Sequence, residues 1–578
     1  MSYPRQLVLS FTLLVIAVAV VYSPVRGGEF LEWDDDHNVY NNEHLRELNG
    51  ENLRWMFFDV GKDTRYKALG WMGWAVIYKW FGLNAGAFHV ANVLVHAVNV
   101  CLVFLLILRF LAIAVPRTET SLLGPINSDV AIATLAAALW ALHPLRVEPV
   151  AWVTGFPYHL AMMFLLGALW FYLGIPHDRP AYRQHGYWLM LGCYLAAIMS
   201  YPMPIGGVAI FFALNVFPFS RVDLRSWQTL FGRETWRVVL ELMPLVLISI
   251  AMLAVAIYGA HVRVGIHTKP PDLDTFPLLA RGMQAAYVWC YYLWKPLLPF
   301  GLSPVYQTFA EFNPLDAKFL LSAVALVGVT WFVWQKRTSW PALAAFWIAH
   351  LGVLVPVLGI NIQGHVASDR YSIIHGLLLS LALGHVLASL SRRGNTDRLL
   401  ALASAAVVFC GSLSWQQCHV WLNNRTFFQR QLDTLPDGGA KAAAHFRMGN
   451  ELRRVNDFPG AAKHYELAKK VYAGIRIPEL PFQHGEVLYA LGRFHEAIPQ
   501  YEAALNLRTD APEVWYGLAQ SWLALGQLDP AAQVCEQALR LHPSVAEFHQ
   551  DLAKIRQTQG RMEEAKAHAE AALRLGGQ

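Results

Sequence analysis

The sequence predicts an all-α membrane protein, in which a polytopic bundle of about eleven transmembrane helices precedes a helical repeat array. Apolar residues make up 55% of the chain and charged residues 15%, whereas an ordinary soluble protein has about 25% charged residues. Towards the C-terminus, small residues recur with a fixed period of 34. Because 578 residues exceed what one core can hold, we expect a membrane domain at 1–435 and a repeat domain at 436–578.

Each crossing needs about 20 mostly apolar residues, or fewer where a helix is buried in protein. The apolar runs lie near 7–23, 88–112, 126–143, 157–175, 187–200, 202–219, 237–258, 318–335, 341–359, 371–390 and 398–414. The first run is long for a signal peptide and lacks a good cleavage site, so we expect it to remain as a span. The fifth and sixth runs could form one helix that is broken at Pro202 and Pro204 between them.

Short basic clusters between the runs predict the orientation of the chain. Pairs such as Arg221 and Arg225, or Lys336 and Arg337, should lie in the cytoplasm. Lys336 and Arg337 would lie on the wrong side if the ambiguous stretch 281–299 also crossed, so we expect that stretch to be re-entrant or surface-lying. With the N-terminus inside, the long polar loops and the whole C-terminus then face the non-cytoplasmic side. The membrane would be the inner membrane in a bacterium or the endoplasmic reticulum in a eukaryote.

The first outer loop, 24–87, is long enough to contain structure of its own. Its helical spacing over 43–60 and its cluster of aromatic residues predict interfacial helices. We expect the aromatic residues to anchor these helices at lipid headgroups, as aromatic belts do; they are Trp71, Trp74, Tyr78, Trp80 and Phe81.

The repeat is most regular near the C-terminus, where Gly492, Gly526 and Gly560 lie 34 residues apart. Small residues at this period, placed where two helices cross, are typical of tetratricopeptide repeats. A degenerate earlier copy around Leu452 lies two residues out of register. We expect about four helix pairs, with a groove for an extended polypeptide substrate or a partner helix.

The acidic run Asp34-Asp35-Asp36, followed by His37, comes directly after the first span. Adjacent carboxylates repel one another, so placing them at a membrane surface is costly unless the charge is needed. We interpret the run as the mouth of an active site, where a carboxylate could deprotonate an acceptor hydroxyl. The structural alternative is a solvated loop or a helix cap.

The outer loop at 143–150 contains His143, Arg146 and Glu148 among prolines and apolar residues. Glu148 is hard to expose fully beside such neighbours, and a second acid near the first would raise the pKa of one of them. A proline-kinked helix end that reaches the interface is the structural alternative, and the sequence leaves both open.

A third group, Asp369-Arg370-Tyr371, precedes the span at 371–390. The guanidinium of Arg370 offers a fixed fork of donors, which suits a lipid-phosphate leaving group. The alternative is that Asp369 caps the helix while Arg370 snorkels to the interface. Further candidates for phosphate binding are Arg263, Lys269, Lys295, Tyr306 and Gln307.

The charge and the cysteine spacing bear on three further kinds of ligand, which are nucleic acid, zinc and other divalent cations. The net charge of +5 is small and is not gathered on one face, which argues against nucleic-acid binding. The six cysteines show neither a CxxC pair nor zinc-ligand spacing with histidine. Several carboxylates could hold a divalent cation, so the metal dependence is left open.

These three groups, in this order and followed by the repeats, resemble the transmembrane and tetratricopeptide-containing O-mannosyltransferases (the TMTC family) of the GT-C glycosyltransferase superfamily. The best-matched pieces are 33–35, 86–96, 143–150 and 367–371. The run from Trp33 to His37 also looks like the Asp-Glu motif of the wider protein O-mannosyltransferases, although Asp36 makes the acidic run longer than their usual pair.

The resemblance implies a GT-C membrane fold and inverting transfer of mannose from a polyprenyl-phosphate donor to a hydroxyl, and the repeats on the outer face favour a polypeptide acceptor. It implies Asp34 as the base, Asp35 as its second member and Arg370 as a phosphate ligand, with Glu148 as a further catalytic candidate. Candidates for binding the acceptor or lining the site are Asp36, His37, His143, Arg146, Asp369 and Tyr371.

Three alternatives stand beside this interpretation. A membrane-anchored repeat scaffold without catalysis would not need the acidic run. A transferase acting on an envelope glycan or lipid would use the same donor. A transporter or polymerase would need charges inside the spans, and these are few, with Glu241 and Arg281 near run ends.

Overall fold

A computed structural model describes residues 2–59, 66–115, 127–262, 273–274, 276–306, 312–359, 367–394, 396–471, 474, 477–508 and 510–576. Every regular element within these ranges is a helix. The chain forms two compact units, Met1–Phe427 (the membrane unit) and Phe428–Gln578 (the repeat unit). The boundary lies within α17 (Asn424–Thr434), just before the boundary expected at 435/436.

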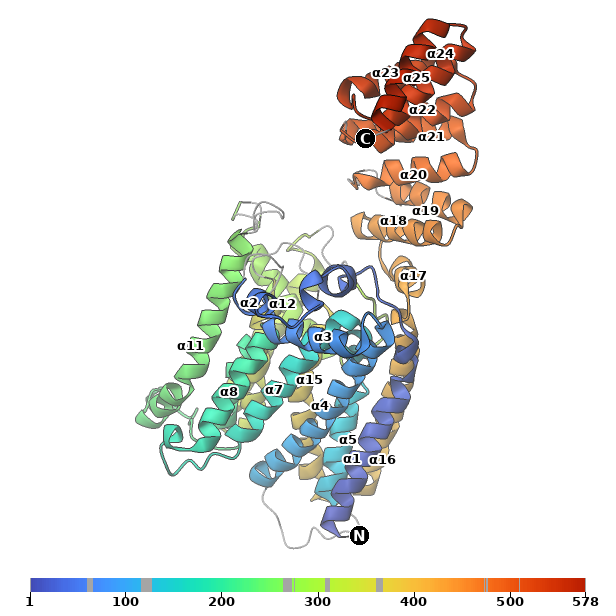
Figure 1. Cartoon of the computed structure of the whole chain (residues 1–578). Coiled ribbons are helices and arrows are strands. Elements are labelled where there is room, and N and C mark those ends of the chain that lie inside the picture. The colour runs from blue at the N-terminus through green and yellow to red at the C-terminus, as the bar shows by residue number, and fades with distance from the viewer. Residues whose placement is uncertain are drawn as a thin grey trace. The chain divides into compact units, whose positions relative to one another are not determined.

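The membrane unit is a bundle of long apolar helices, drawn from blue to yellow in Figure 1. The helices of the bundle are α1 (Tyr3–Val21), α4 (Ala85–Ala114), α5 (Ser128–Ala141), α7 (Phe156–Tyr172), α8 (His185–Ser200), α9 (Val208–Val216), α11 (Arg233–Val262), α12 (Leu278–Trp294), α13 (Ala317–Lys336), α14 (Pro341–Leu354), α15 (Ser372–Ser391) and α16 (Thr396–Cys418). The other α-helices described wholly within this unit are α2 (Gly50–Phe58), α3 (Ala68–Phe81), α6 (Val147–Ala151) and α10 (Trp227–Leu230).

Helix α5 lies in the interior because it is rich in alanine. Ala133, Ala136 and Ala137 are completely buried, and such small side chains let neighbouring helices approach closely. Helices α1, α4, α15 and α16 all pack against α5. The loop that follows α5 and the turn that precedes α15 also contact each other. The helix packing therefore brings together two of the three predicted site groups.

The apolar outer surface of the bundle suits a membrane. Within the described ranges, seven helices are long and apolar enough to span one, or eight if the bent pair Ser128–Ala141 and Pro144–Ala151 is one span. These seven cover the predicted runs at 7–23, 88–112, 157–175, 237–258, 318–335, 371–390 and 398–414. The runs at 187–200, 202–219 and 341–359 form shorter helices, so the predicted total of about eleven crossings is not confirmed.

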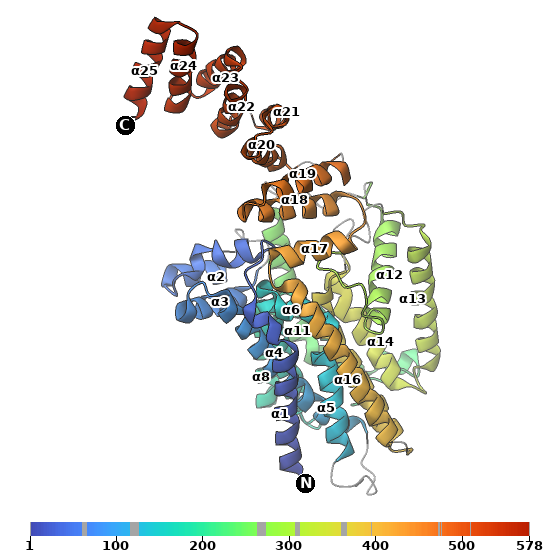
Figure 2. The same ribbon diagram turned by 90° about the vertical axis from the view of Figure 1, so that its right-hand side faces the viewer.

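The stretch predicted to be re-entrant, 281–299, forms α12 and the turn after it. Helix α12 is 17 residues long and packs against α13 and α14. Figure 2 shows α12 and α13 side by side. That α12 is re-entrant or lies on the membrane surface therefore stays a prediction.

The first outer loop contains α2 and α3, and α3 packs on the ends of α4, α7 and α8. The prediction that its aromatic residues form a belt is wrong for Trp71 and Trp74, which are 1% and 0% exposed in a core with Met56 and Phe88. Trp80 and Phe81, at the end of α3, are 75% and 62% exposed. The aromatic side chains of α3 differ in exposure because one face of the helix packs on the bundle while the other stays uncovered.

The described part of the repeat unit contains four helix pairs, which confirms the predicted array. They are α18 (Gly439–Arg454) with α19 (Phe458–Val471), α20 (Glu479–Ala490) with α21 (Phe494–Leu507), α22 (Pro512–Ala524) with α23 (Leu528–Leu541), and α24 (Ala546–Thr558) with α25 (Met562–Gly576). Gly492, Gly526 and Gly560 end the first helix of the last three pairs with φ of +73°, +72° and +79°, a conformation that costs glycine little. Asn456 takes this place in the first pair with φ of +63°, which explains why that copy looks degenerate.

Candidate functional site

The acidic run turns sharply after the end of α1, and the turn separates its carboxylates. Asp35 is completely buried, whereas Asp34 is exposed. The Asp35 Oδ1 accepts hydrogen bonds from the Thr154 backbone N–H at 2.9 Å and from the Thr154 hydroxyl at 2.6 Å, and its Oδ2 accepts one from the Leu31 N–H at 2.9 Å. Burial raises the pKa of Asp35 to about 7, although these hydrogen bonds oppose the rise. Asp35 therefore ties the acidic run to the loop after α6.

Asp34 has a backbone conformation that non-glycine residues rarely adopt, with φ of +69°. Its carbonyl accepts hydrogen bonds from the Asn38 backbone N–H at 2.9 Å and from the Asn38 side-chain amide at 2.7 Å. The buried ammonium of Lys67 in turn donates to Asn38 Oδ1 at 2.5 Å. Backbone strain held by surrounding contacts is common at functional sites. Here it directs the Asp34 carboxylate outward while Asp35 points inward.

Trp152 joins the acidic run to the third predicted group. Its indole Nε1 donates to the Trp33 carbonyl at 3.0 Å. The guanidinium carbon of Arg370 lies 5.5 Å from the centre of a Trp152 ring and 5.0 Å from that of Tyr371, within the range of a cation–π interaction. Segments 119 and more residues apart in the chain therefore meet around one indole.

Glu148 and Arg370 form a buried ion pair. The Arg370 guanidinium donates to Glu148 Oε1, and the Arg370 backbone N–H donates to Glu148 Oε2 at 2.8 Å. Their side chains are 3% and 17% exposed. Both carboxylate oxygens are thus engaged, which fits Glu148 for positioning Arg370 better than for taking a proton. The Nε of Arg370 has no partner among the described residues.

Asp369 faces a different set of groups. Its Oδ1 accepts a hydrogen bond from the Tyr306 hydroxyl at 2.8 Å, and it lies within electrostatic range of Lys295 and Arg146. The Lys295 ammonium donates to the Phe300 carbonyl at 2.7 Å. Lys295 and Tyr306, named from sequence as weaker phosphate-binding candidates, therefore do lie beside the Asp369-Arg370 group.

Arg146 lies deeper in the bundle and is 2% exposed. Gly376 leaves room for it, since a Cβ at Gly376 would lie 2.6 Å from an Arg146 nitrogen. Its Nε and one terminal nitrogen have no hydrogen-bond partner in the described part of the chain. Buried charges normally need partners, and the nearby acid is Asp369. Arg146 is therefore too deeply buried to line an open surface, and it lies within electrostatic range of Asp369.

Of the other predicted lining residues, His143 holds the local fold, whereas Asp36 and His37 lie near Asp34. His143 donates through Nε2 to the Pro296 carbonyl at 2.9 Å and accepts through Nδ1 from the Leu145 N–H at 3.2 Å, so both ring nitrogens are engaged. Asp36 is partly exposed and His37 is exposed near Asp34. Arg263, Lys269 and Gln307 lie outside the described residues.

Three residues that hold the site together were not predicted to do so: Thr154, Trp152 and Lys67. Each acts through a partner distant in sequence, as in the bond between Lys67 and Asn38, 29 residues apart. A lone lysine directly before the aromatic helix α3, and a polar Thr154 within an apolar run, were the available signals.

The described residues contain no group of three or more histidine, cysteine, aspartate or glutamate side chains placed to hold a metal ion. The divalent cation left open by the sequence gains no support at the acidic run, because Asp35 turns away from Asp34 and is saturated by hydrogen-bond donors.

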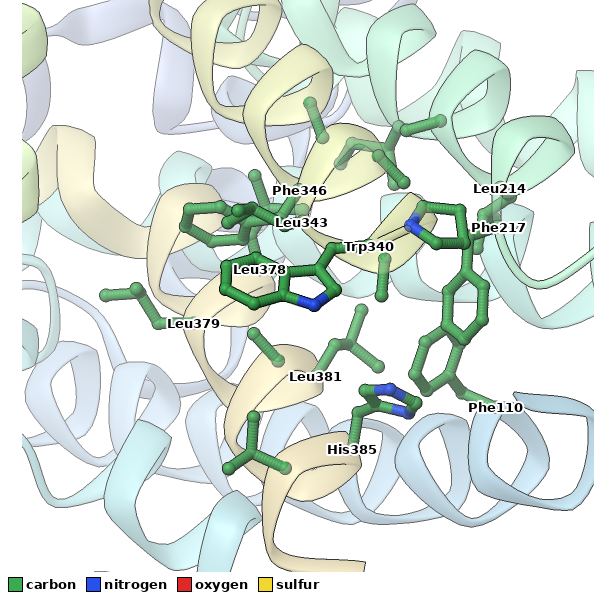
Figure 3. A pocket seen from close by; sticks show the side chains of 18 of the residues that line it. Phe110, Leu214, Phe217, Trp340, Leu343, Phe346, Leu378, Leu379, Leu381 and His385 are labelled. Atoms are coloured by element: carbon green, nitrogen blue, oxygen red, sulfur yellow. The ribbon is translucent and has the colours of Figure 1, made fainter. Parts of the chain in front are cut away.

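An apolar pocket of about 670 Å³ lies farther along α15, between α4, α9 and α14. Figure 3 shows its walls, which include Phe217, Trp340, Leu378 and His385. Its lining on α15 begins at Leu378, nine residues after Asp369, or about 14 Å at 1.5 Å per helical residue. The lining therefore suits a hydrocarbon chain, and the pocket is separate from Asp369 and the polar groups around it.

Comparison with known proteins identifies the repeats. Residues 482–546 match the tetratricopeptide repeat family. The C-terminal helical repeats are therefore tetratricopeptide-like. No curated protein matches the chain. Among solved structures, the chain is similar to MamA from Desulfovibrio magneticus RS-1, with 17% identity over 26% of this chain and 82% of that one and a TM-score of 0.24. It is also similar to YrrB, described as a TPR protein with an unusual peptide-binding site, with 21% identity over 26% of this chain and 74% of that one and a TM-score of 0.24.

Proposed function

We propose that this chain is an integral-membrane glycosyltransferase that moves a sugar, mannose by family resemblance, from a polyprenyl-phosphate donor to a hydroxyl on a polypeptide. The observation that carries the proposal is the meeting of the three polar groups around Trp152. Acid–base transfer from a phosphate ester requires a base and a cation held in place. The exposed Asp34 carboxylate would be the base and the ion-paired Arg370 the cation, and Trp152 links their two segments.

Asp34 is the proposed base. Its carboxylate is exposed on a strained turn, and Asp35 fixes that turn from within through three hydrogen bonds. The acceptor oxygen attacks the anomeric carbon, its proton passes to Asp34, and the bond from that carbon to the phosphate oxygen breaks with inversion. Precise placement of the reacting groups supplies much of the rate in such a step.

The leaving phosphate is proposed to bind on the side of Arg370 and Lys295. Glu148 neutralises part of the Arg370 charge, so Arg370 alone is a weak anion site. Lys295 adds a second cation, whose ammonium donates to the Phe300 carbonyl and lies within electrostatic range of Asp369. Because both cations would contact the phosphate, loss of either should weaken donor binding without abolishing it.

The hydrocarbon part of the donor is proposed to occupy the apolar pocket of Figure 3. Its lining is almost entirely aliphatic and aromatic, from Phe110 on α4 to Val386 on α15. Burying hydrocarbon there would contribute about 0.8 kcal/mol per methylene group. The repeat array is proposed to hold the polypeptide acceptor, because arrays of this kind bind extended peptides.

The test uses purified full-length protein, radiolabelled polyprenyl-phosphate mannose and a panel of hydroxyl-bearing peptides. Wild type is compared with Asp34→Asn and with the matched control Glu51→Gln, which likewise neutralises an exposed carboxylate of the same outer loop. We expect Asp34→Asn to lower transfer by about 100-fold or more, as loss of a general base does, and the control to retain most activity. Equal transfer by all three proteins would exclude Asp34 as the base.

The second candidate function is a membrane-anchored scaffold, which the tetratricopeptide match favours on its own. It requires partner binding by the repeat unit and no chemistry. Absence of transfer from every polyprenyl-phosphate sugar tested, combined with capture of the same partners by wild type and Asp34→Asn, would favour the scaffold.

A further inference from the structure

The first and last helix pairs of the array each contain two histidines in direct contact. In the first pair, the Nδ1 atoms of His445 on α18 and His464 on α19 lie 3.0 Å apart. In the last pair, the Nδ1 atoms of His549 on α24 and His568 on α25 also lie 3.0 Å apart. Both contacts join residues 19 positions apart in the chain. The two histidine pairs therefore occupy the same place in their repeats.

The two central repeats lack these histidines. Counting back by the 34-residue period from the last pair, the equivalent positions hold Trp515 with Val534, and Pro481 with Gln500. Packing of the repeat therefore does not require histidine at either position. The histidine pairs therefore occur in the first and last of the four described helix pairs.

We propose that each histidine pair is a binding site for one divalent transition-metal ion of the Cu²⁺, Ni²⁺ and Zn²⁺ class. Imidazole nitrogen suits these ions. With metal–nitrogen distances of about 2.0–2.1 Å, two nitrogens in neighbouring positions lie about 2.9 Å apart in square-planar geometry and about 3.4 Å apart in tetrahedral geometry. The separation of 3.0 Å in both pairs fits the first geometry directly and the second after a small side-chain movement.

Each pair can exchange its internal hydrogen bond for a metal ion. In the metal-free protein one Nδ1–H donates to the Nδ1 of the other ring. When an ion binds both Nδ1 atoms, the donating ring carries its proton on Nε2 instead, so both rings coordinate as neutral imidazoles.

The two sites differ in access. His445 is 8% exposed, whereas His549 and His568 are both partly exposed. The described residues offer no third side-chain ligand in either place, so water completes the coordination. Two-histidine sites of this kind bind metal moderately, and the last pair should fill first.

Metal binding would cross-link the two helices of one pair. An ion that joins α18 to α19, or α24 to α25, binds the folded state and stabilises it by mass action.

The test is Cu²⁺ titration of the full-length protein without a histidine tag, at pH 7.5, against a competing chelator. The chain has 22 histidines, so the variants provide the reference. His464→Gln and His568→Gln each remove one ligand while keeping a neutral hydrogen-bonding side chain, and exposed His495→Gln is the matched control. We expect each single change to remove one equivalent of Cu²⁺, the double change to remove two, and the control to remove none.

A second readout separates metal binding from folding. Circular dichroism without metal should be the same for all variants, and Zn²⁺ should raise the unfolding midpoint of the repeat unit in wild type but not in the double variant. Equal Cu²⁺ stoichiometry and affinity in wild type and the double variant would overturn the proposal. So would a Zn²⁺-dependent midpoint shift of the same size in both.

Discussion

The indole Nε1 of Trp152 donates to the carbonyl of Trp33 at 3.0 Å, and this bond fixes the backbone beside Asp34. It joins the acidic run to the loop that also carries Glu148. Trp152→Phe keeps an aromatic face for Arg370 but removes the donor. We expect transfer activity to fall by about tenfold or more, since a misplaced catalytic group loses rate steeply. The measurement is kcat with saturating donor, and an unchanged kcat would show that this tether does not position the base.

Asp34 and Asp35 should respond differently to the same change. Asp34→Asn should reduce turnover and leave the unfolding midpoint unchanged, because the side chain is exposed. Asp35→Asn replaces an oxygen that accepts from N–H or O–H donors by an amide that donates, which should destabilise the membrane unit by about 1–3 kcal/mol. Thermal unfolding in detergent, measured beside turnover, distinguishes the two. Equal destabilisation by both would contradict the division of roles.

Removing Glu148 should expose the cost of burying Arg370. Glu148→Gln leaves a largely buried guanidinium without its counter-ion, and breaking a buried ion pair in this way costs about 3–5 kcal/mol. Adding Arg370→Gln should recover part of the lost stability, because the unpaired charge is then gone. The comparison is a double-mutant cycle on the unfolding midpoint. Strictly additive losses would mean that the two side chains do not interact.

Filling the apolar pocket should weaken donor binding specifically. Ala382 lines the pocket on α15, and Ala382→Phe would occupy part of its volume. We expect KM for a long-chain polyprenyl-phosphate donor to rise several-fold while kcat stays close to wild type, because the pocket lining contains neither Asp34 nor Arg370. A short-chain donor is the control and should be affected less. A fall in kcat with constant KM for both donors would contradict the assignment.

Acid should loosen the repeat unit. Burial lowers the pKa values of His445 and His484 to about 4, against about 6.5 in an unfolded chain. The unfolded state therefore binds more protons between these values, so stability is complete above about pH 6.5 and falls as the pH drops towards 4. Hydrogen exchange of α18 to α21, corrected for intrinsic rates, should show less protection at pH 5 than at pH 7.5. Protection that does not change with pH would contradict this assignment, and the double change His445→Asn and His484→Asn should flatten the dependence.

The local features of this protein follow from its sequence. Apolar runs predict membrane helices because each run alone meets the length and composition that a bilayer requires. The repeat is equally local, since glycines 34 residues apart end successive helices in a left-handed conformation. The acidic run, the 143–150 loop and Arg370 were also recognisable, because charges beside apolar spans are costly and few.

Only the tertiary structure decided how these charges divide their roles. Asp34 and Asp35 are chemically identical neighbours, and burial of one rather than the other depends on Thr154, which lies 119 residues away. Glu148 meets Arg370 across 222 residues, and Trp71 joins a core instead of an aromatic belt because α3 packs on the bundle. Sequence periodicity describes which face of a helix is apolar, but the partner that covers that face is set by packing of the whole chain.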